Sequence, residues 1–317
     1  MSEFDLIKRY FTRAAPSALL GVGDDCALLQ VKPGAVLAVS SDMLVSGTHF
    51  FPDADPYLLG HKTLAVNLSD LAAMGAVPRW ATLAISLPNA DEAWLARFSA
   101  GFFALASQFG VDLVGGDTTR GPLNLCVTIF GEVDAAHALH RSSAKVGDEI
   151  WVSGRLGDAA LALAHLQGEI NLSDEHYAVC AQALHQPEPR VALGLALSGI
   201  SRCAIDISDG LLSDLAHILD ASGVGANIDF SALPVTPVLA MYLNTPLGRR
   251  CLLSGGDDYE LCFTVNEHQH ETIKAISVQL SLPLTCVGRI VAGQGCVVLD
   301  GNNLPINFET IGYDHFR

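Results

Sequence analysis

Positive charge is scarce in this sequence. Its 317 residues include 18 lysines and arginines against 34 aspartates and glutamates, which gives a formal net charge of −16. Proteins that bind DNA or RNA need a basic surface to meet the phosphate backbone, so nucleic acid is excluded as a principal partner. An anionic membrane surface is disfavoured for the same reason.

The sequence also lacks a cysteine framework, a long apolar run and a leader segment. The eight cysteines show no CxxC spacing, and several lie in apolar runs such as LCVTIF and LCFTV, which is typical of buried, reduced thiols. No run of about 18 apolar residues predicts a membrane-spanning helix. The N-terminal MSEFDLIKRYF has no basic segment followed by an apolar block, so no signal peptide is predicted. We therefore expect a cytoplasmic protein with no membrane association.

Several common catalytic signatures are absent. The sequence contains no GxxxxGK[ST], no GxSxG and no HExxH, which are the marks of P-loops, nucleophile elbows and zinc proteases. GVGDDC begins like the GxGxxG dinucleotide fingerprint but has Cys26 at the third glycine, and GVGANI fails in the same way at Ile228. No covalent nucleophile is predicted, and a phosphate bound by this chain would need positive charge from outside the motif loops.

Half of the residues are hydrophobic, so a sizeable core is available. Apolar periodicity predicts helices over about 1–13, 56–76, 91–110, 156–167, 174–185, 190–199, 209–222 and 267–280. Strands are predicted over 26–31, 35–41, 80–87, 111–114, 123–133, 149–153, 203–207, 225–230, 259–265 and near 284–298. Asp55 with Pro56, and Asp91, are placed to begin the helices at 56 and 91.

This alternation predicts an α+β fold with some α/β-like character. The mixed, polar segment 134–148 interrupts the pattern and predicts a junction between two domains, 1–137 and 138–317.

Aspartates recur where apolar runs meet glycine or small polar residues. They are Asp25 in GVGD, Asp42 after AVLAVSS, Asp117 in VGGDTT, Asp206 and Asp209 in DISDG, and Asp257 and Asp258 in SGGDDYE. Ligand sites in α/β proteins form at strand ends, and glycine there lets the backbone approach a ligand closely. Asp70 differs because it lies within the helix predicted over 56–76, on one face with Asn67, where a partly buried carboxylate needs a partner.

Convergence of these carboxylates would require cations. Two carboxylates about 4 Å apart repel by roughly 4 kcal/mol at an effective dielectric near 20, which corresponds to about three pKa units. Oxygen ligands favour Mg²⁺, Mn²⁺ or Ca²⁺ over zinc, and Mg²⁺ commonly recruits substrate phosphates. The hypothesis is a carboxylate cage around divalent ions that in turn bind phosphates. Arg141 is the one basic residue expected near a phosphate, and His49 is the one histidine retained for the site.

Each motif alone has a simpler explanation. An aspartate after glycine commonly bonds its own backbone in a turn, which is the expected role of Asp24. GGDTT could be a tight turn, Asp209 could N-cap the following helix, and Asp70 could be a solvated helix position. The recurrence of the pattern in six segments with few cations nearby favours a shared site.

Six segments in order resemble the thiamine-monophosphate kinase family: GVGDDCALL, SDMLVSGTHF, NLSDLAAMGA, GGDTTRGPL, DISDGLLSDL and SGGDDYELCF. That family shares a superfamily with aminoimidazole ribonucleotide synthetase and selenophosphate synthetase. The resemblance covers nearly the whole chain. It implies an N-terminal α+β domain that forms a homodimer by joining its sheet to the partner's in a shared barrel, and a sandwich-like C-terminal α+β domain.

The resemblance also implies a reaction. It is the ATP-dependent phosphorylation of thiamine monophosphate to thiamine diphosphate, the last step of thiamine diphosphate biosynthesis, with several Mg²⁺ ions. Residues 1–137 would bind ATP and metal and form the dimer, and residues 138–317 would complete the nucleotide and substrate site.

The resemblance assigns roles position by position. The metal ligands would be Asp25, Ser40, Ser41, Asp42, Asp70, Asp117, Asp206 and Asp209, among which the cage Asp42, Asp70, Asp117 and Asp209 acts electrostatically. Gly116, Asp117, Arg141 and Ser208 would contact ATP, and His49, Asp257 and Tyr313 would line the thiamine monophosphate site. The family commonly has glutamate in GGEDYEL, where this chain has the shorter Asp257.

The implied chemistry agrees with the residues. Phosphoryl transfer requires positioning and charge neutralisation more than a covalent nucleophile, and the acceptor phosphate oxygen is already ionised near neutral pH. Two alternatives remain open. One is another ATP-dependent synthetase of the superfamily, although no reactive cysteine in a glycine-rich N-terminal loop supports the selenophosphate branch. The other is a non-enzymatic protein that binds divalent cations, although no EF-hand spacing supports it.

Overall fold

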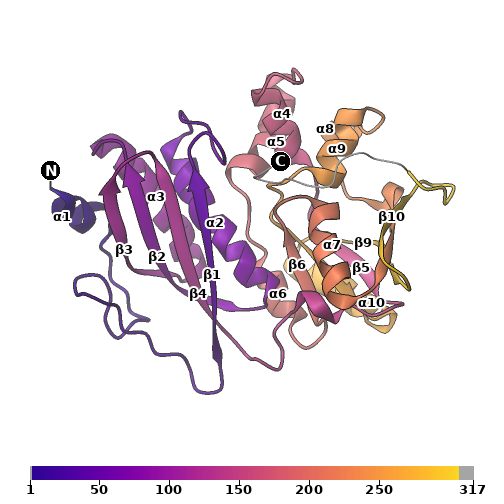
Figure 1. The fold of residues 1–317 in the computed structure, drawn as a ribbon, viewed down its shortest axis with the longest axis horizontal. Coiled ribbons are helices and arrows are strands. Elements are labelled where there is room, and N and C mark those ends of the chain that lie inside the picture. The colour runs from indigo at the N-terminus through magenta and orange to yellow at the C-terminus, as the bar shows by residue number, and fades with distance from the viewer. Residues whose placement is uncertain (1, 307–317) are drawn as a thin grey trace. The chain divides into compact units, whose positions relative to one another are not determined.

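The computed structural model describes residues 2–306, so Tyr313 lies outside the described residues. The chain divides into two compact units (Figure 1). Unit 1 takes the residues up to Leu71 and from Ala76 to Ala136, and unit 2 takes Ala72–Gly75 and the residues from His137 onward. Over residues 2–306, no helix combines the length and the apolar character needed to cross a bilayer.

Unit 1 is built on a four-stranded sheet of order β1-β4-β2-β3. Its strands are β1 (Val36–Val45), β4 (Asn124–Val133), β2 (Val77–Leu87) and β3 (Asp112–Arg120). The β2–β3 pair is parallel, and β1–β4 and β4–β2 are antiparallel. Cross-strand partners share a face of the sheet, so the register fixes which site residues lie on the same side.

Two long helices, α2 (Pro56–Ala73) and α3 (Glu92–Phe109), cover one face of this sheet (Figure 1). The predicted caps are confirmed: Asp55 accepts the N–H of Tyr57 at 2.9 Å, and Asp91 accepts that of Ala93 at 2.9 Å. Burial of large side chains drives the packing, and Trp80, Phe98, Phe102, Leu64 and Leu68 are fully buried.

The two helices pack very closely at a pair of glycines. A Cβ on Gly60 would lie 2.1 Å from the carbonyl oxygen of Phe98, and one on Gly101 would lie 1.9 Å from that of Tyr57. No side chain fits at either position, so glycine is required there by packing alone.

The opposite face of the unit 1 sheet carries apolar side chains that are exposed to solvent. Leu37, Val39 and Met43 alternate along β1, and they are 41%, 55% and 55% exposed. A row of exposed apolar residues on a sheet face is typical of a surface that another structure covers.

Unit 2 has a six-stranded sheet of order β10-β7-β9-β5-β8-β6. The strands are β10 (Gly295–Leu299), β7 (Gly225–Asp229), β9 (Leu284–Val291), β5 (Glu149–Ser153), β8 (Glu260–Val265) and β6 (Cys203–Ile207). Only β10–β7 is parallel among these pairs.

The helices of unit 2 fall into two groups. A common core includes residues of α4 (Asp158–Leu166), α5 (Asp174–His185), α7 (Leu211–Ser222), α8 (Pro237–Ala240) and α9 (Pro246–Ser254). The helices α6 (Val191–Leu197) and α10 (His270–Leu280) contact each other. Short 3-10 turns lie at η2 (Arg141–Ser143), η3 (Phe230–Ala232) and η4 (Glu267–Gln269).

The predicted α+β class is confirmed, with three differences in detail. The first helix begins as α1 (Glu3–Leu6) and continues as a π-helix, η1 (Ile7–Phe11). The strand predicted over 26–31 is wrong: that segment takes part only in an isolated bridge between Leu20 and Leu28, and Leu28 is 55% exposed. The helices α8 and α9 are absent from the predicted elements because each is short, although each begins with a helix signal, a threonine cap followed by proline.

The strands at two site motifs are longer than predicted. The sequence suggested that strands end before Asp42 and Asp117, but β1 continues to Val45 and β3 to Arg120. The polar and small residues there remain hydrogen-bonded to their neighbouring strands, so both aspartates lie within strands.

Candidate active site

In unit 1, two side chains of α2 contact the middle of β1. The Ser40 hydroxyl donates to Oδ2 of Asp70 at 2.5 Å, and the backbone N–H of Asp42 donates to Oδ1 of Asn67 at 3.1 Å. Asn67 and Asp70 are three residues apart and so share a helix face, while Ser40 and Asp42 share a side of the strand. The structure thus brings three predicted metal ligands, Ser40, Asp42 and Asp70, into one neighbourhood.

Ser41 points to the other side of the sheet. Its hydroxyl lies 3.0 Å from that of Thr128 and donates to the carbonyl oxygen of Val127 at 3.1 Å. Ser41 therefore belongs to the exposed face that carries Val39 and Met43, and its side chain does not share the neighbourhood of Asp70.

Gly116 and Asp117 lie on β3, with β4 and β2 between them and β1. Asp117 is exposed and pairs in register with Ala84, which is also exposed. Gly116 has φ 146°, and a Cβ there would lie 1.9 Å from the carbonyl oxygen of Leu83. Only glycine allows β2 and β3 to approach this closely, and this strained point directly precedes Asp117.

The N-terminal loop presents the aspartate pair of GVGDD. Asp25 is exposed, and its backbone N–H donates to Oδ1 of Asp24 at 3.0 Å. The expected role of Asp24 in shaping the turn is confirmed, and this leaves the Asp25 carboxylate at the surface of the loop.

His49 lies in the turn that follows β1. Its Nδ1 accepts the backbone N–H of Val45 at 3.0 Å. In the neutral imidazole the proton then lies on Nε2, which makes that nitrogen the donor of the ring.

In unit 2, the DISDG loop is organised around Asp214. One oxygen of this buried carboxylate accepts the backbone N–H groups of Ser208, Asp209 and Gly210, at 3.0, 3.0 and 3.1 Å. Burial raises the pKa of Asp214 to about 7; the three N–H donors oppose this shift, and the Asp209 charge adds to it. The alternative that Asp209 caps α7 is wrong, because the N-cap position of α7 is Gly210 and no side chain caps the helix.

This arrangement affects phosphate binding. The N-terminus of a helix is normally an anion site because its N–H groups are unpaired. In the loop just before α7, the N–H groups of Ser208, Asp209 and Gly210 are already bound to the Asp214 carboxylate. A phosphate could use these three N–H groups only by displacing Asp214.

The SGGDDYE loop packs directly on the DISDG loop. The N–H of Asp257 donates to the carbonyl oxygen of Ser208 at 2.9 Å, and that of Tyr259 to Ile207 at 2.8 Å. Glycine makes this approach possible: a Cβ on Gly256 would lie 2.4 Å from the carbonyl oxygen of Ser208. The predicted residues Ser208, Asp209 and Asp257 are therefore neighbours.

The backbone conformation at Asp257 suits the aspartate that this chain has in place of the glutamate of the resemblance. Asp257 has φ 69°, in the left-handed region, which aspartate adopts more readily than most residues other than glycine. The Tyr259 hydroxyl donates to Oδ1 of Asp257 at 3.1 Å, which orients the shorter carboxylate.

Asp258 holds the SGGDDYE loop against the residue that precedes α4. Both of its carboxylate oxygens lie within hydrogen-bond distance of the Gly157 N–H, at 2.9 and 3.0 Å, just before α4. Burial raises the pKa of Asp258 well above its ordinary value, and the charges of Glu260 and Asp158 add to this shift. The sequence analysis gave roles to Asp257 and Asp209, flagged Asp258 without a role and missed Asp214, although Asp258 and Asp214 hold their loops. The only signals were the second aspartate of SGGDDYE and the third of DISDGLLSDL.

Two other predicted residues lie close by in unit 2. Asp206 is buried in β6, pointing away from the core occupied by Ile205 and Ile207. Arg141 lies exposed in η2, and its carbonyl oxygen accepts the Ser222 hydroxyl at 3.0 Å.

The donors of both units are oxygen atoms from carboxylates and hydroxyls. Within residues 2–306, no three His, Cys, Asp or Glu side chains form a metal-binding group by themselves. Mg²⁺ commonly uses only one or two carboxylates and completes its shell with water and substrate phosphates. The donor chemistry around Ser40, Asp42 and Asp70 therefore fits Mg²⁺ better than zinc.

We predict that Asp214→Ala lowers the free energy of unfolding by about 2 to 4 kcal/mol, because each buried donor left unpaired costs about 1 to 3 kcal/mol. Urea denaturation followed by circular dichroism measures this. Asp220→Ala, on the exposed side of the same helix, is the matched control and should change stability by less than about 0.5 kcal/mol. Equal losses in the two variants would show that Asp214 does not hold the loop.

Comparison with known proteins identifies the family. Residues 23–133 match the family model of the AIR synthase related protein, N-terminal domain, and residues 145–301 match that of the C-terminal domain. The chain is 48% identical over 320 residues to the thiamine-monophosphate kinase of Salmonella typhimurium, covering 99% of this chain and 98% of that protein.

Solved structures agree. The crystal structure of thiamine-monophosphate kinase from Stenotrophomonas maltophilia is similar with a TM-score of 0.87 at 48% identity, covering 94% of this chain and 96% of that one. A structure of AaThiL complexed with AMPPCP and TMP has a TM-score of 0.79 at 28% identity, covering 99% of this chain and 96% of that one. From the matched domains and the full-length identity, the chain belongs to the thiamine-monophosphate kinase family of AIR synthase related proteins.

Proposed function

We propose that the chain transfers the terminal phosphoryl group of ATP to thiamine monophosphate, which gives thiamine diphosphate and ADP. The observation that carries this proposal is the full-length similarity to thiamine-monophosphate kinases. It includes a structure bound to AMPPCP, an analogue of ATP, and to TMP. The motif loops of both units lie within the matched regions.

We propose that Mg²⁺ ions are bound by Asp25, Ser40, Ser41, Asp42, Asp70, Asp117, Asp206 and Asp209, some through water or backbone. The contact between Ser40 and Asp70, with Asp42 beside it, supports the unit 1 part of this set. When bound, Mg²⁺ would neutralise phosphate charge that this acidic chain leaves unbalanced.

The chain's own residues hold these donors in place. Ser40 fixes the orientation of the Asp70 carboxylate, and Asn67 fixes the strand at Asp42. Asp214 holds the Ser208 and Asp209 backbone, so these side chains project from a rigid loop. Such preorganisation is what phosphoryl transfer requires, since most of its catalysis comes from positioning and charge stabilisation.

The remaining roles follow the family positions. Gly116, Asp117, Arg141 and Ser208 contact ATP, and His49 and Asp257, with Tyr313, line the thiamine monophosphate site. Residues 1–137 then bind nucleotide and metal and form the dimer, and residues 138–317 complete the site. The hydroxyl of Tyr259, by orienting Asp257, supports this role for the shorter acid.

Two further features belong to the same proposal. The exposed row Leu37, Val39 and Met43 supports a homodimer formed through the unit 1 sheet. The eight free thiols, several of which have pKa values raised by burial, support a reducing cytoplasmic location.

Incubation of the purified chain with ATP, Mg²⁺ and thiamine monophosphate tests the reaction. We expect one thiamine diphosphate per ADP, and no turnover once EDTA removes the divalent ions. Consumption of ATP without thiamine diphosphate would instead favour another synthetase of the superfamily. Tight Ca²⁺ uptake with no nucleotide binding in Mg²⁺ would favour a non-enzymatic binding protein.

Asp42→Asn tests the ion site. The variant keeps the size of the side chain, so it should fold normally, while kcat falls by about 100-fold or more because charge stabilisation of the transition state is lost. Nucleotide affinity should fall in Mg²⁺ and stay unchanged without it. Asp53→Asn, at an exposed loop position outside the motifs, is the control, and a wild-type rate in Asp42→Asn would count against the ion site.

Val39→Asp tests the dimer. An unpaired charge buried in an apolar interface costs several kcal/mol, so the dissociation constant of the dimer should rise by about 100-fold or more. Sedimentation velocity over a range of concentrations measures it. Val278→Asp places the same charge at an 80% exposed position on α10 and should leave the dimer intact. If Val39→Asp sediments as the wild type does, the contact between subunits lies elsewhere.

A further inference from the structure

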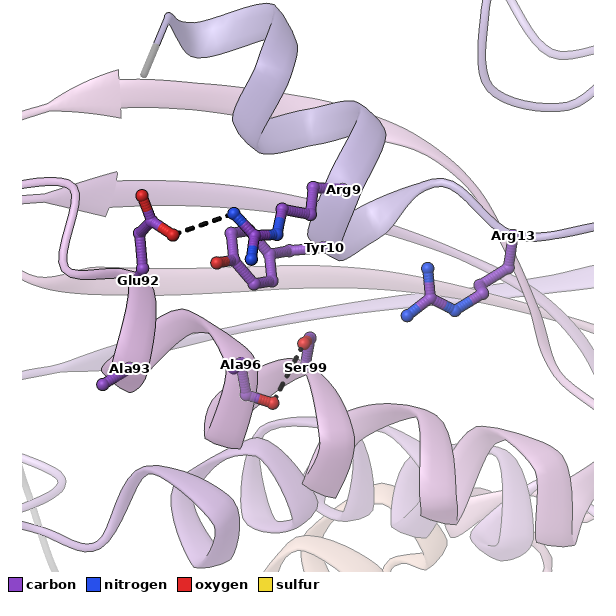
Figure 2. A pocket seen from close by; sticks show the side chains of 7 residues that line it. All are labelled: Arg9, Tyr10, Arg13, Glu92, Ala93, Ala96 and Ser99. Carbon is purple, nitrogen blue, oxygen red and sulfur yellow. Dashed lines mark hydrogen bonds and ion pairs between the residues drawn. The ribbon is translucent and has the colours of Figure 1, made fainter.

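A cleft of about 460 Å³ lies in unit 1 between the N-terminal segment and α3. Arg9, Tyr10 and Arg13 come from η1 and the residues after it, and Glu92, Ala96 and Ser99 come from α3 (Figure 2). None of these residues belongs to a motif of the candidate active site, so the cleft is a separate feature of the chain.

The cleft concentrates cations in a chain that has few. Arg9 forms an ion pair with Glu92 at 2.8 Å. The Arg13 guanidinium lies 4.8 Å from the centre of the Phe103 ring and donates to the carbonyl oxygen of Thr12 at 2.8 Å. Over residues 2–306, no carboxylate forms an ion pair with Arg13. Two guanidinium groups and one carboxylate therefore line the cleft, in a protein whose net charge is −16.

The walls of the cleft are about equally polar and apolar. Tyr10 is buried, and its ring lies 5.3 Å from the Arg9 guanidinium. Ala96 contributes a methyl group, and the buried Ser99 donates its hydroxyl to the Ala96 carbonyl oxygen at 3.3 Å. Figure 2 shows the two arginine side chains extending over α3. The cleft thus combines a cationic edge with an aliphatic side formed by α3.

The local backbone also points to a binding role. Arg9 and Tyr10 lie in the π-helix η1, a widened turn that is rare in proteins and is found frequently at functional sites. Guanidinium groups bind carboxylates and phosphates through paired N–H donors, and aromatic or aliphatic walls bind the organic part of a ligand.

We propose that this cleft binds a small organic anion. Its phosphate or carboxylate would lie against Arg13 and Arg9, and its flat body against Ala93 and Ala96. The proposal is independent of the kinase reaction, since it uses none of the residues assigned to that site.

Isothermal titration calorimetry on the full chain tests the proposal with phenyl phosphate and benzoate as probes. We expect saturable binding of at least one probe, and the tighter one identifies the anion as phosphate or carboxylate. Arg13→Gln should weaken it by about tenfold or more, the usual effect of losing a charged hydrogen bond. Lys8→Gln removes the same charge from the same segment without lining the cleft and should bind as the wild type does.

A second pair of variants tests whether binding needs the open volume of the cleft, with the charge of the arginines unchanged. Ala96→Phe fills the cleft and should abolish binding, whereas Ala100→Phe, exposed on the same helix, should not. Thermal unfolding of all four variants verifies that they fold. Absence of saturable binding to the wild type, or equal binding by Arg13→Gln and Lys8→Gln, would overturn the proposal.

Discussion

The motif loops of this protein depend on carboxylates that are held by backbone N–H groups and hydroxyls. Asp214 accepts three N–H groups of the DISDG loop, Asp258 accepts that of Gly157, and Ser40 donates to Asp70. Since lysine and arginine are few, neutral donors carry much of the electrostatic stabilisation that basic residues supply elsewhere. These bonds fix the loops, and the loops in turn fix the side chains assigned to ions and substrate.

The same interactions bear on the proposed cation. A helix N-terminus and a glycine-rich turn are the usual phosphate binders when lysine is absent, but the N–H groups of Ser208, Asp209 and Gly210, in the turn before α7, are already bound to Asp214. Asp25 and Asp117 add exposed carboxylates to the proposed site. The metal ions proposed above would let a polyphosphate substrate approach such carboxylates.

Much of the fold follows from local sequence. The helix expected over 174–185 is present as α5 (Asp174–His185), and both aspartate caps in unit 1 are as expected, because capping and amphipathic periodicity are local effects. The predicted ends of two strands were wrong, because pairing between distant strands decides where these strands end. Local composition around Asp42 and Asp117 resembles a strand end, yet the neighbouring strands keep both aspartates within the sheet.

In the candidate site, too, local sequence predicted some features, and contacts between distant segments decided the others. Residue types and spacing identified Asp42 and Asp70, and the family resemblance added Ser40, but their contact depends on how α2 packs across β1, which no short segment encodes. Asp214 and Asp258 received no role because their partners are backbone groups, which leave no trace in side-chain chemistry. The meeting of the unit 1 and unit 2 residues stays a prediction.

The close contact of α2 and α3 through Gly60 and Gly101 has a consequence for tolerance to mutation. One end of α2 is held against α3 with no room for a methyl group, and the other end carries Asn67 and Asp70. A rigid helix transmits a displacement along its length, so a bulkier residue at either glycine would shift Asn67 and Asp70 without touching them. If Asp70 binds metal as proposed, variation at these two remote positions is constrained by activity as well as by folding.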